Sequence, residues 1–308
     1  MIPSDTDEMT NRLTLFANSG AGSVQSQQLR EIWYECVPDH CRGGAYFLQS
    51  TDTFESTLAS ALADCQRRDS ALIVAGGDGT LSSVINTVAG SDQRIAFLPQ
   101  GTFNFFARSR GVPLDPKLAL EFALNAKTVA LSLAYLNDHA FIVNVGLGLY
   151  PKIIAARESH QQVTGRSSVS AIASGIWTLL RERHLSRAKL HYDGGTHRLI
   201  TPLLVIGHNR SQLEQLDPRF VVAAKKLTVL RMHPVHKFKL LKILANGLIG
   251  RLLDEENMDC FGVDELTVQM PGKSVRVALD GELIKMPLPL QFTVRPNAIQ
   301  CLLQEGEA

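Results

Sequence analysis

The chain has 308 residues, 45% of them hydrophobic and 20% charged, and its net charge of +1 gives no general attraction to nucleic acid. Its five cysteines include no CxxC pair, which argues against a zinc site or a disulfide framework and favours free thiols. No apolar run approaches the ~20 residues of a membrane-spanning helix, and segment 1–12 lacks a signal-peptide core, so we expect a cytoplasmic protein.

The first 130 or so residues alternate between strand-like and helix-like segments. Strands are expected over 12–17, 46–49, 71–75 and 95–98, and helices up to 36 and over 54–67, 81–88, 104–110 and 116–125. This alternation predicts a parallel sheet covered by helices, with a binding crevice at the carboxyl ends of the strands.

The rest of the chain has a different pattern. Short strands are expected over 129–136, 140–145, 199–207, 227–232, 265–270, 274–279, 290–294 and 298–303, with helical insertions over 151–183 and 235–254. These strands predict an antiparallel β-sandwich. The predicted organisation is therefore an α/β domain over 1–128 and a β-sandwich domain over 129–308.

The strand at 71–75 ends in the sequence Gly76-Gly77-Asp78-Gly79-Thr80. Glycines let the backbone approach a phosphate closely, and the free N–H groups of the following helix favour an anion. We expect Thr80 to cap that helix. Among phosphate-binding amides, Asp78 could serve as a magnesium ligand or as a general base. The simpler interpretation is that Asp78 is a solvated residue of a tight turn.

Two further strand ends carry glycine turns, at 18–22 and 101–104. Because the carboxyl ends of parallel strands lie along one edge of a sheet, the three turns together favour a phosphate-binding crevice.

The segment 76–81 resembles the signature of the diacylglycerol kinase catalytic-domain family, which includes bacterial lipid kinases and sphingosine kinases. Three more segments are similar to family motifs in the expected order, at 18–22, 101–108 and 280–282. The resemblance implies an ATP-dependent kinase that phosphorylates a lipid hydroxyl with Mg²⁺. In that family the α/β domain binds nucleotide, the β-sandwich helps to hold lipid, and the active site lies between them.

The resemblance also implies roles for single residues. Nucleotide contacts are implied at Asn18, Gly22, Gly76, Gly77, Gly79, Thr80, Gly101, Thr102 and Asn104. Asp78 would be catalytic, and Asp280 and Glu282 would act as general base or in a metal network. The metal ligands are not assigned. From the residues alone, Asp280-Gly281 is typical of a plain hairpin turn with exposed acids.

Three acids of the family pattern are absent. Ser82-Ser83 replaces Asn-Glu, Phe105 replaces the acid after the motif asparagine, and 222–227 contains no acid. These differences leave two alternatives to a lipid kinase. One is a catalytically degenerate nucleotide- or lipid-binding protein, and the other is an NAD kinase, which shares the Gly-Gly-Asp-Gly-Thr turn.

A lipid substrate requires access to a bilayer. Residues 225–242 contain six lysines and arginines and no acid, which would suit peripheral contact with an anionic inner membrane face. The alternative is an amphipathic helix packed on its own domain. Exposed sandwich edges would also allow a homodimer. The acceptor lipid itself is not determined.

Overall fold

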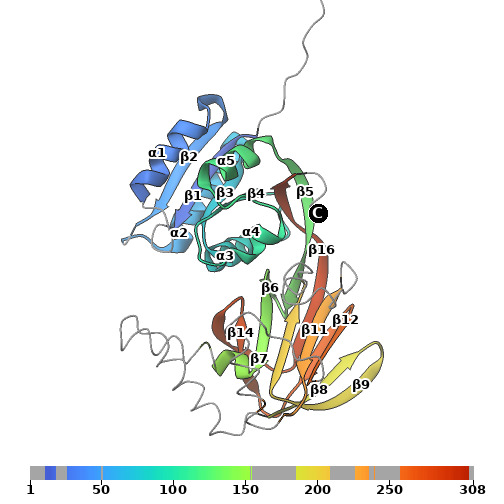
Figure 1. Ribbon diagram of the computed structural model, residues 1–308. Helices are drawn as coiled ribbons and strands as arrows, with labels where there is room; N and C mark the ends of the chain where they lie inside the picture. Colours follow the sequence, from blue (N-terminus) through green and yellow to red (C-terminus); the bar gives the residue numbers. More distant parts are fainter. Residues whose placement is uncertain are drawn as a thin grey trace, which may run out of the picture. The chain divides into compact units, whose positions relative to one another are not determined.

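The computed structural model describes residues 11–18, 26–49, 51–152, 154, 185–208, 226–235, 239 and 257–304 (Figure 1). The chain forms two compact units. The first comprises Met1–Ser132 with Pro296–Ala308, and the second comprises Leu133–Arg295.

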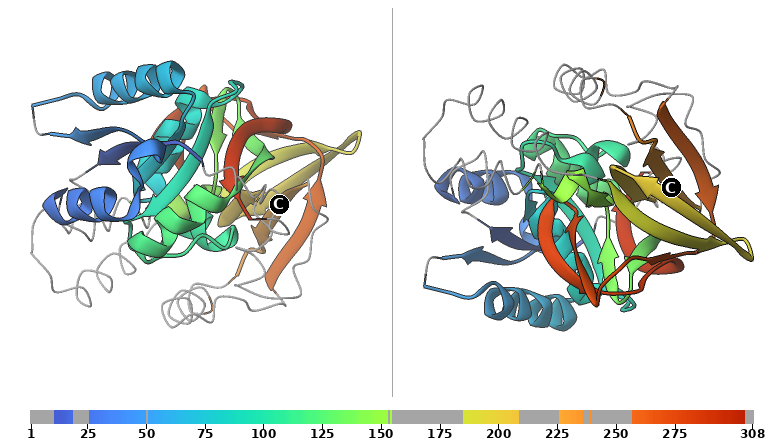
Figure 2. Two further views of the ribbon diagram at one scale, coloured as in Figure 1. Left: turned by 90° about the horizontal axis from the view of Figure 1, so that it is seen from above. Right: turned by 90° about the horizontal axis from the view of Figure 1, so that it is seen from below.

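The first unit contains a parallel sheet in the order β2-β1-β3-β4. Its strands are β1 (Leu13–Asn18), β2 (Arg42–Leu48), β3 (Ala71–Gly76) and β4 (Arg94–Pro99). All six residues of β3 are buried, because helices cover both faces of a parallel sheet and each face needs an apolar surface. Figure 2 shows α2 on one face and α1 with α5 on the other.

The helices of this unit are α1 (Ser26–Cys36), the short 3₁₀ helix η1 (Asp39–Cys41), α2 (Phe54–Arg68), α3 (Asp78–Val88), α4 (Phe105–Ser109) and α5 (Pro116–Asn125). Side chains cap two of them: Thr53 accepts a hydrogen bond at the start of α2, and Asp115 accepts two at the start of α5. The predicted cap at Thr80 is wrong. Helix α3 begins three residues earlier than expected, at Asp78 with Gly77 as its N-cap, because the N–H of Leu81 already donates to the carbonyl of Gly77 at 3.1 Å.

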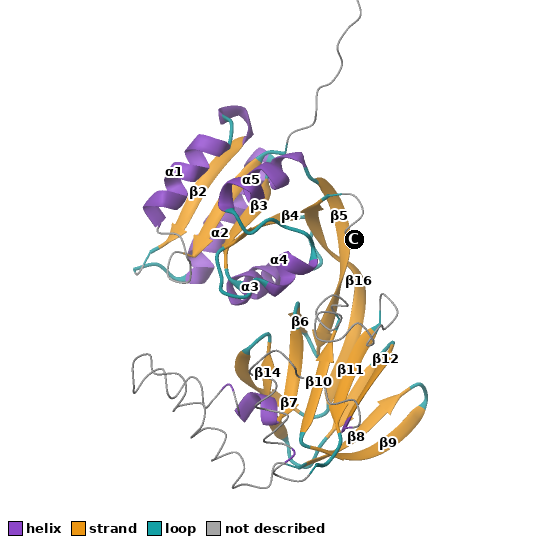
Figure 3. Ribbon diagram, viewed as in Figure 1, coloured by secondary structure: helices purple, strands orange, loops and turns teal. Residues whose placement is uncertain are grey.

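The second unit is antiparallel (Figure 3). One six-stranded sheet has the order β12-β11-β10-β7-β14-β15. Its strands are β7 (Asn144–Gly148), β10 (Leu203–Gly207), β11 (Leu227–Met232), β12 (Met258–Val263), β14 (Ser274–Leu279) and β15 (Glu282–Pro287). The other strands of the unit are β5 (Lys127–Leu136), β6 (His139–Phe141), β8 (Ser186–Tyr192), β9 (Gly195–Thr201), β13 (Leu266–Gln269) and the first part of β16 (Leu290–Leu303).

One buried cluster fills the second unit. It combines side chains of the six-stranded sheet, such as Val145 and Ile206, with side chains of the other strands, such as Leu190 and Phe292. Two sheets that share a core form a β-sandwich. The predicted fold class, an α/β domain followed by an antiparallel β-sandwich, is therefore confirmed.

The two strands predicted over 290–294 and 298–303 form one strand, β16, which belongs to both units. Its first part pairs with β13, whereas Gln300 and Cys301 pair in parallel with β4. Residues from Pro296 onward consequently belong to the first unit, although the sequence placed all of 129–308 in the second domain. The parallel pairing of β16 with β4, about 200 residues earlier in the chain, assigns these residues to the first unit. The local sequence pattern contains no information about that pairing.

Two predicted strands are each broken in two. The segment 199–207 divides at Pro202, which has no N–H for a ladder, so β9 and β10 lie in different sheets. The segment 140–145 divides between β6 and β7. The structure also adds three strands that the sequence did not predict: β8, β12 and β15. The predicted insertions over 151–183 and 235–254 lie almost entirely outside the described residues.

Candidate functional site

The glycine loop after β3 leaves the start of α3 open. The first N–H groups of a helix have no partner within it, and the N-cap, Gly77, has no side chain to cap them. A Cβ at Gly76 would lie 2.6 Å from the Cβ of Thr80, so the buried Thr80 side chain packs against a bare backbone. The hydroxyl of Thr80 accepts a hydrogen bond from Asn18 Nδ2 at 3.0 Å, which links the end of β1 to α3.

The loops after β3 and β4 are in backbone contact. A Cβ at Gly101 would lie 2.8 Å from the Cα of Gly77, and a Cβ at Gly77 would lie 3.2 Å from the Cα of Gly101. The N–H of Gln100 donates to the carbonyl of Gly76 at 2.9 Å. Glycine is required at this crossing because any side chain would push the two loops apart.

Asn104 closes the second loop on itself. Its Oδ1 accepts the N–H of Gly101 at 2.9 Å, and its Nδ2 donates to the carbonyl of Gly101 at 2.7 Å. The residue is buried and has a φ of +50°, which asparagine tolerates better than most residues. The amide of Asn104 therefore shapes the loop, whereas the neighbouring Thr102 is exposed to solvent.

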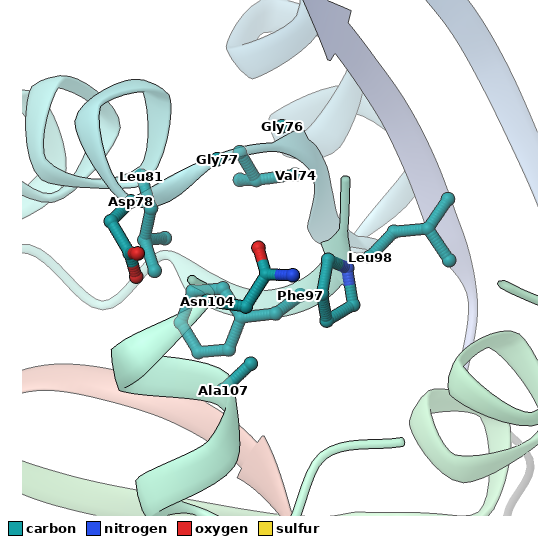
Figure 4. Close-up of a pocket in the computed structure, with 10 residues that line it drawn as sticks. Val74, Gly76, Gly77, Asp78, Leu81, Phe97, Leu98, Asn104 and Ala107 are labelled. Carbon is teal, nitrogen blue, oxygen red and sulfur yellow. The ribbon is translucent and has the colours of Figure 1, made fainter. Parts of the chain in front are cut away.

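Asp78 joins the two loops. Its Oδ2 accepts the N–H of Phe105 at 3.1 Å, and its Oδ1 accepts the N–H of Phe106 at 3.3 Å. The carboxylate thus takes the capping position at the start of α4, where Asn104 makes no side-chain cap. Figure 4 shows Asp78 and Asn104 beside the backbone of Gly76 and Gly77.

A recess of about 230 Å³ lies beneath these loops, a volume that includes solvent at its mouth. Most of its lining is apolar: Val74, Leu81, Phe97, Leu98, Pro99 and Ala107. Only about 10 Å³ of it is free for a water-sized molecule, which is room for about one water. The recess therefore holds no part of a nucleotide as it stands, and the polar surface offered to an anion is the backbone of the glycine loop.

The described residues contain no group of three His, Cys, Asp or Glu side chains that could hold a metal ion. Asp78 is the one carboxylate on the loops 76–80 and 101–104. Magnesium that arrives on nucleotide phosphates needs only one or two protein carboxylates, so the residues present are compatible with a metal carried by the nucleotide.

In the second unit, Asp280 and Gly281 form the turn between β14 and β15, with φ values of +48° and +91°. The carboxylate of Asp280 accepts three backbone N–H groups, from Ile142 at 3.0 Å, Val143 at 2.8 Å and Asn144 at 3.1 Å. Asp280 therefore holds the corner at which β6 gives way to β7. That corner interrupts the single strand predicted over 140–145.

Glu282 differs from Asp280 in its surroundings. It is exposed at the first position of β15, and among the described residues its side chain makes no hydrogen bond or ion pair. Of the two acids in the Asp-Gly-Glu segment, Glu282 is the one with a carboxylate open to a substrate.

Sequence reasoning missed two buried amides. Gln100 is 4% exposed, and its Nε2 has no hydrogen-bond partner in the described part of the chain. Oδ1 of Asn144 is also buried, although the residue as a whole is half-buried. Burial raises the pKa of the neighbouring Tyr150, and a hydrogen bond with the Asn144 side chain opposes that shift. A sequence pattern that could have identified Gln100 is a polar residue at the end of an apolar run, as in Phe97-Leu98-Pro99-Gln100.

The basic segment 225–242 is only partly described, and its described cations are less free than the sequence suggested. Lys226 pairs with Asp264 at 3.3 Å, and Arg231 pairs with Asp259 at 2.5 Å. Both acids come from beyond the segment, so a count over 225–242 could not include them. Gly22 lies outside the described residues, as do Lys225, Lys237 and Lys242.

The chain thus has the fold of a parallel α/β unit joined to a β-sandwich unit, with a glycine loop at the carboxyl end of β3. Residues 12–136 match the family model of the diacylglycerol kinase catalytic domain. The resemblance noted from the motifs is therefore confirmed for this part of the chain.

Relatives extend the similarity beyond that domain. A YegS-like protein of Serratia proteamaculans, named a probable lipid kinase, is 28% identical over 249 residues, which cover 78% of each chain. A protein of the same name from Cronobacter sakazakii is 33% identical over 109 residues, or 34% of this chain and 36% of the relative. A crystal structure of a diacylglycerol kinase from Bacillus anthracis covers 97% of this chain and 99% of its own, with a TM-score of 0.66 at 17% identity. That likeness supports the fold. Within the part of the chain that the structure describes, no helix is long and apolar enough to span a bilayer.

Proposed function

We propose that this protein is an ATP-dependent lipid kinase that transfers the γ-phosphoryl group to a hydroxyl of a diacylglycerol-like or sphingosine-like acceptor. The observation that carries the proposal is the open N-terminus of α3 at Gly77, held against the loop at Gly101. The names of the relatives support a lipid as the acceptor.

On the donor side, the N–H groups at the start of α3 would bind phosphate oxygens, because the helix dipole and the unpaired donors both favour negative charge. Gly77 and Gly79 would let those oxygens approach the backbone. Magnesium bound to the nucleotide would neutralise charge that develops on the phosphates. Asp78 holds the two loops in register and offers the one carboxylate near that charge.

On the acceptor side, Glu282 would accept the proton of the lipid hydroxyl as general base. The structure supports Glu282 in this role because its carboxylate is exposed, whereas the carboxylate of Asp280 already accepts three backbone hydrogen bonds. Asp280 would then be a positioning residue that fixes the turn leading to Glu282.

A second candidate is a catalytically degenerate protein that binds nucleotide or lipid. Two observations favour it. Phe105 stands where the family has an acid and only its backbone N–H contacts Asp78, and the two described glycine loops carry a single carboxylate. Phosphoryl transfer depends on charge neutralisation as well as positioning, so a reduced set of acids is a real difference from the family pattern.

Transfer from γ-labelled ATP separates these candidates. The purified protein would be incubated with labelled MgATP and mixed micelles containing diacylglycerol, monoacylglycerol, sphingosine or phosphatidylglycerol, with NAD in a parallel reaction. We expect label in the lipid extract. Nucleotide binding without any transfer would favour the binding protein, and label in NAD alone would favour an NAD kinase.

We further propose that the protein works in the cytoplasm, in peripheral contact with the inner membrane face, since its acceptor would lie in a bilayer. Flotation with anionic vesicles tests this contact, and neutral vesicles are the control. Sedimentation of the protein alone tests the expected homodimer.

A further inference from the structure

Strands β8 and β9 form a hairpin at one end of their sheet, with β9 as the outermost strand (Figure 1). Side chains alternate between the two faces of a strand. The inner face of the hairpin carries Ala188, Leu190 and Leu199, which belong to the buried core of the second unit. The side chains between them therefore point away from that core and form the outward face of the hairpin.

The outward face of the hairpin carries three cations. Lys189 lies directly opposite Arg198, and Arg187 is two residues before Lys189 on the same strand. All three are exposed, and within the described part of the chain their side chains have no ion pair or hydrogen bond. On its other side, Lys189 lies opposite Gln269 of β13. The paired positions on either side of Lys189 thus hold no acid.

Two aliphatic side chains stand beside these cations. Ile200 lies directly opposite Arg187 and is 46% exposed. Leu185, two residues before Arg187, is 53% exposed. Aliphatic surface is unfavourable in water, and like charges directly opposite each other destabilise the pairing of two strands. Both features cost stability in the free protein, and both become favourable against a surface that is anionic and apolar.

Protection of a sheet edge does not account for this face. Charged side chains on an outermost strand prevent pairing with other chains, which would explain Arg198 on β9. Edge protection would not explain Arg187 and Lys189, because β8 is paired on both sides. It would not explain the exposed Ile200 either, since an aliphatic residue on an outermost strand promotes association.

We propose that the outward face of the β8–β9 hairpin is the surface through which this protein contacts an anionic lipid bilayer. The cations would bind lipid phosphates, while Leu185 and Ile200 would enter the headgroup region. The inference rests on the proposed function, whose acceptor would lie in a bilayer, and it assigns the contact to residues outside segment 225–242. A polyanion such as RNA would match the cations but would leave the two aliphatic side chains in water.

The test is flotation of the full chain with phosphatidylcholine vesicles that contain phosphatidylglycerol, over a range of lipid concentrations. Each cation near an anionic leaflet strengthens binding about fivefold, so Lys189→Gln/Arg198→Gln should weaken it about 20- to 30-fold. The matched control is Arg276→Gln/Lys285→Gln. These two residues also lie directly opposite each other, on β14 and β15, but among the described residues no exposed leucine or isoleucine lies beside them. The control should bind like the wild type.

A second variant, Leu185→Gln/Ile200→Thr, tests the apolar part of the surface. Threonine keeps the β-branched shape that suits a strand, and the loss of apolar contact should weaken vesicle binding at least ~10-fold. Thermal unfolding of every variant without lipid checks the fold. We expect no lower unfolding temperature in Lys189→Gln/Arg198→Gln, since the substitutions remove a repulsion.

Equal weakening by the hairpin pair and the control pair would overturn the inference, because net charge and not this face would then be responsible. Unchanged binding in Leu185→Gln/Ile200→Thr would also contradict it, as would a loss of binding matched by a loss of stability. Wild-type protein that binds single-stranded RNA through the hairpin and does not float with vesicles would make the face a polyanion site instead.

The outcomes for the inference and for the proposed function can be told apart. If the wild type floats through the hairpin but labels no lipid in mixed micelles, lipid kinase activity fails while the inference stands. If it labels micellar lipid and the hairpin variants float like the wild type, only the inference fails.

Discussion

Replacing Asp280 by asparagine would change one acceptor into a donor at the corner between β6 and β7. The carboxylate now accepts the N–H groups of Ile142, Val143 and Asn144. An asparagine amide accepts at one end only, so at least one of these groups would face an NH₂ group. The turn itself should persist, because asparagine tolerates the positive φ of this position.

The magnitude follows from these contacts. A hydrogen bond to a charged group contributes about 1.5–3 kcal/mol, and an unsatisfied buried donor costs about 1–3 kcal/mol. Because the corner is only partly buried, we expect Asp280→Asn to lower the free energy of unfolding by about 2–4 kcal/mol. Urea unfolding followed by circular dichroism measures this loss.

The chain supplies a matched control at Asp193. It also begins an Asp-Gly hairpin turn, with φ values of +49° and +71°, but it is exposed and its carboxylate accepts no hydrogen bond among the described residues. Asp193→Asn should change stability by less than about 0.5 kcal/mol. Equal effects of the two substitutions would refute the reasoning, because the turn and not the carboxylate would then be responsible.

Three further substitutions test the site and its scaffold. Gly101→Ala would place a Cβ 2.8 Å from the Cα of Gly77, and the resulting separation of the loops should weaken ATP binding at least ~10-fold; unchanged affinity in a nucleotide titration would contradict the backbone crossing. Burial acts to raise the pKa of Asp64, but hydrogen bonds from its neighbours lower it below its usual value. Its charge therefore stabilises the fold above about pH 4, and that contribution is lost as the pH falls through the lowered pKa. The stability difference between the wild type and Asp64→Asn, measured by urea unfolding at a series of pH values, should be largest near neutral pH and shrink in acid; a constant difference would argue against this. Glu282→Gln should reduce label transfer to lipid by ~10²–10⁴-fold while the exposed control Glu265→Gln retains it, and equal activity would remove Glu282 as the base.

The α/β unit could be predicted because its signals are local. Every residue of Ala71–Gly76 is apolar, as a strand covered on both faces requires. The glycines after it indicate a place where the backbone approaches another group closely. The helix over Pro116–Asn125 was predicted at its observed bounds, since a proline at its first position and an aspartate cap both lie in the sequence beside it.

The side-chain contacts that the sequence analysis did not predict share one cause: they join residues that lie far apart along the chain. Lys226 seemed free in its own segment, yet Asp264, 38 residues away, neutralises it. The carboxylate of Asp280 accepts backbone N–H groups that lie 136 to 138 residues earlier in the chain, contacts that the sequence did not predict, and its expected catalytic role stays a prediction. No pattern within a short window reports either pairing.

Glycine spacing, strand periodicity and the missing acids are properties of neighbouring residues, so they suffice to locate a candidate phosphate site. The role of each polar side chain at that site depends instead on the folded chain. Asp78 and Asn104 bond to backbone, while Gln100 is buried with a donor still unpaired. The physical reason is that a hydrogen bond depends on which groups the fold places within about 3 Å of each other, and that distance is unrelated to separation along the chain.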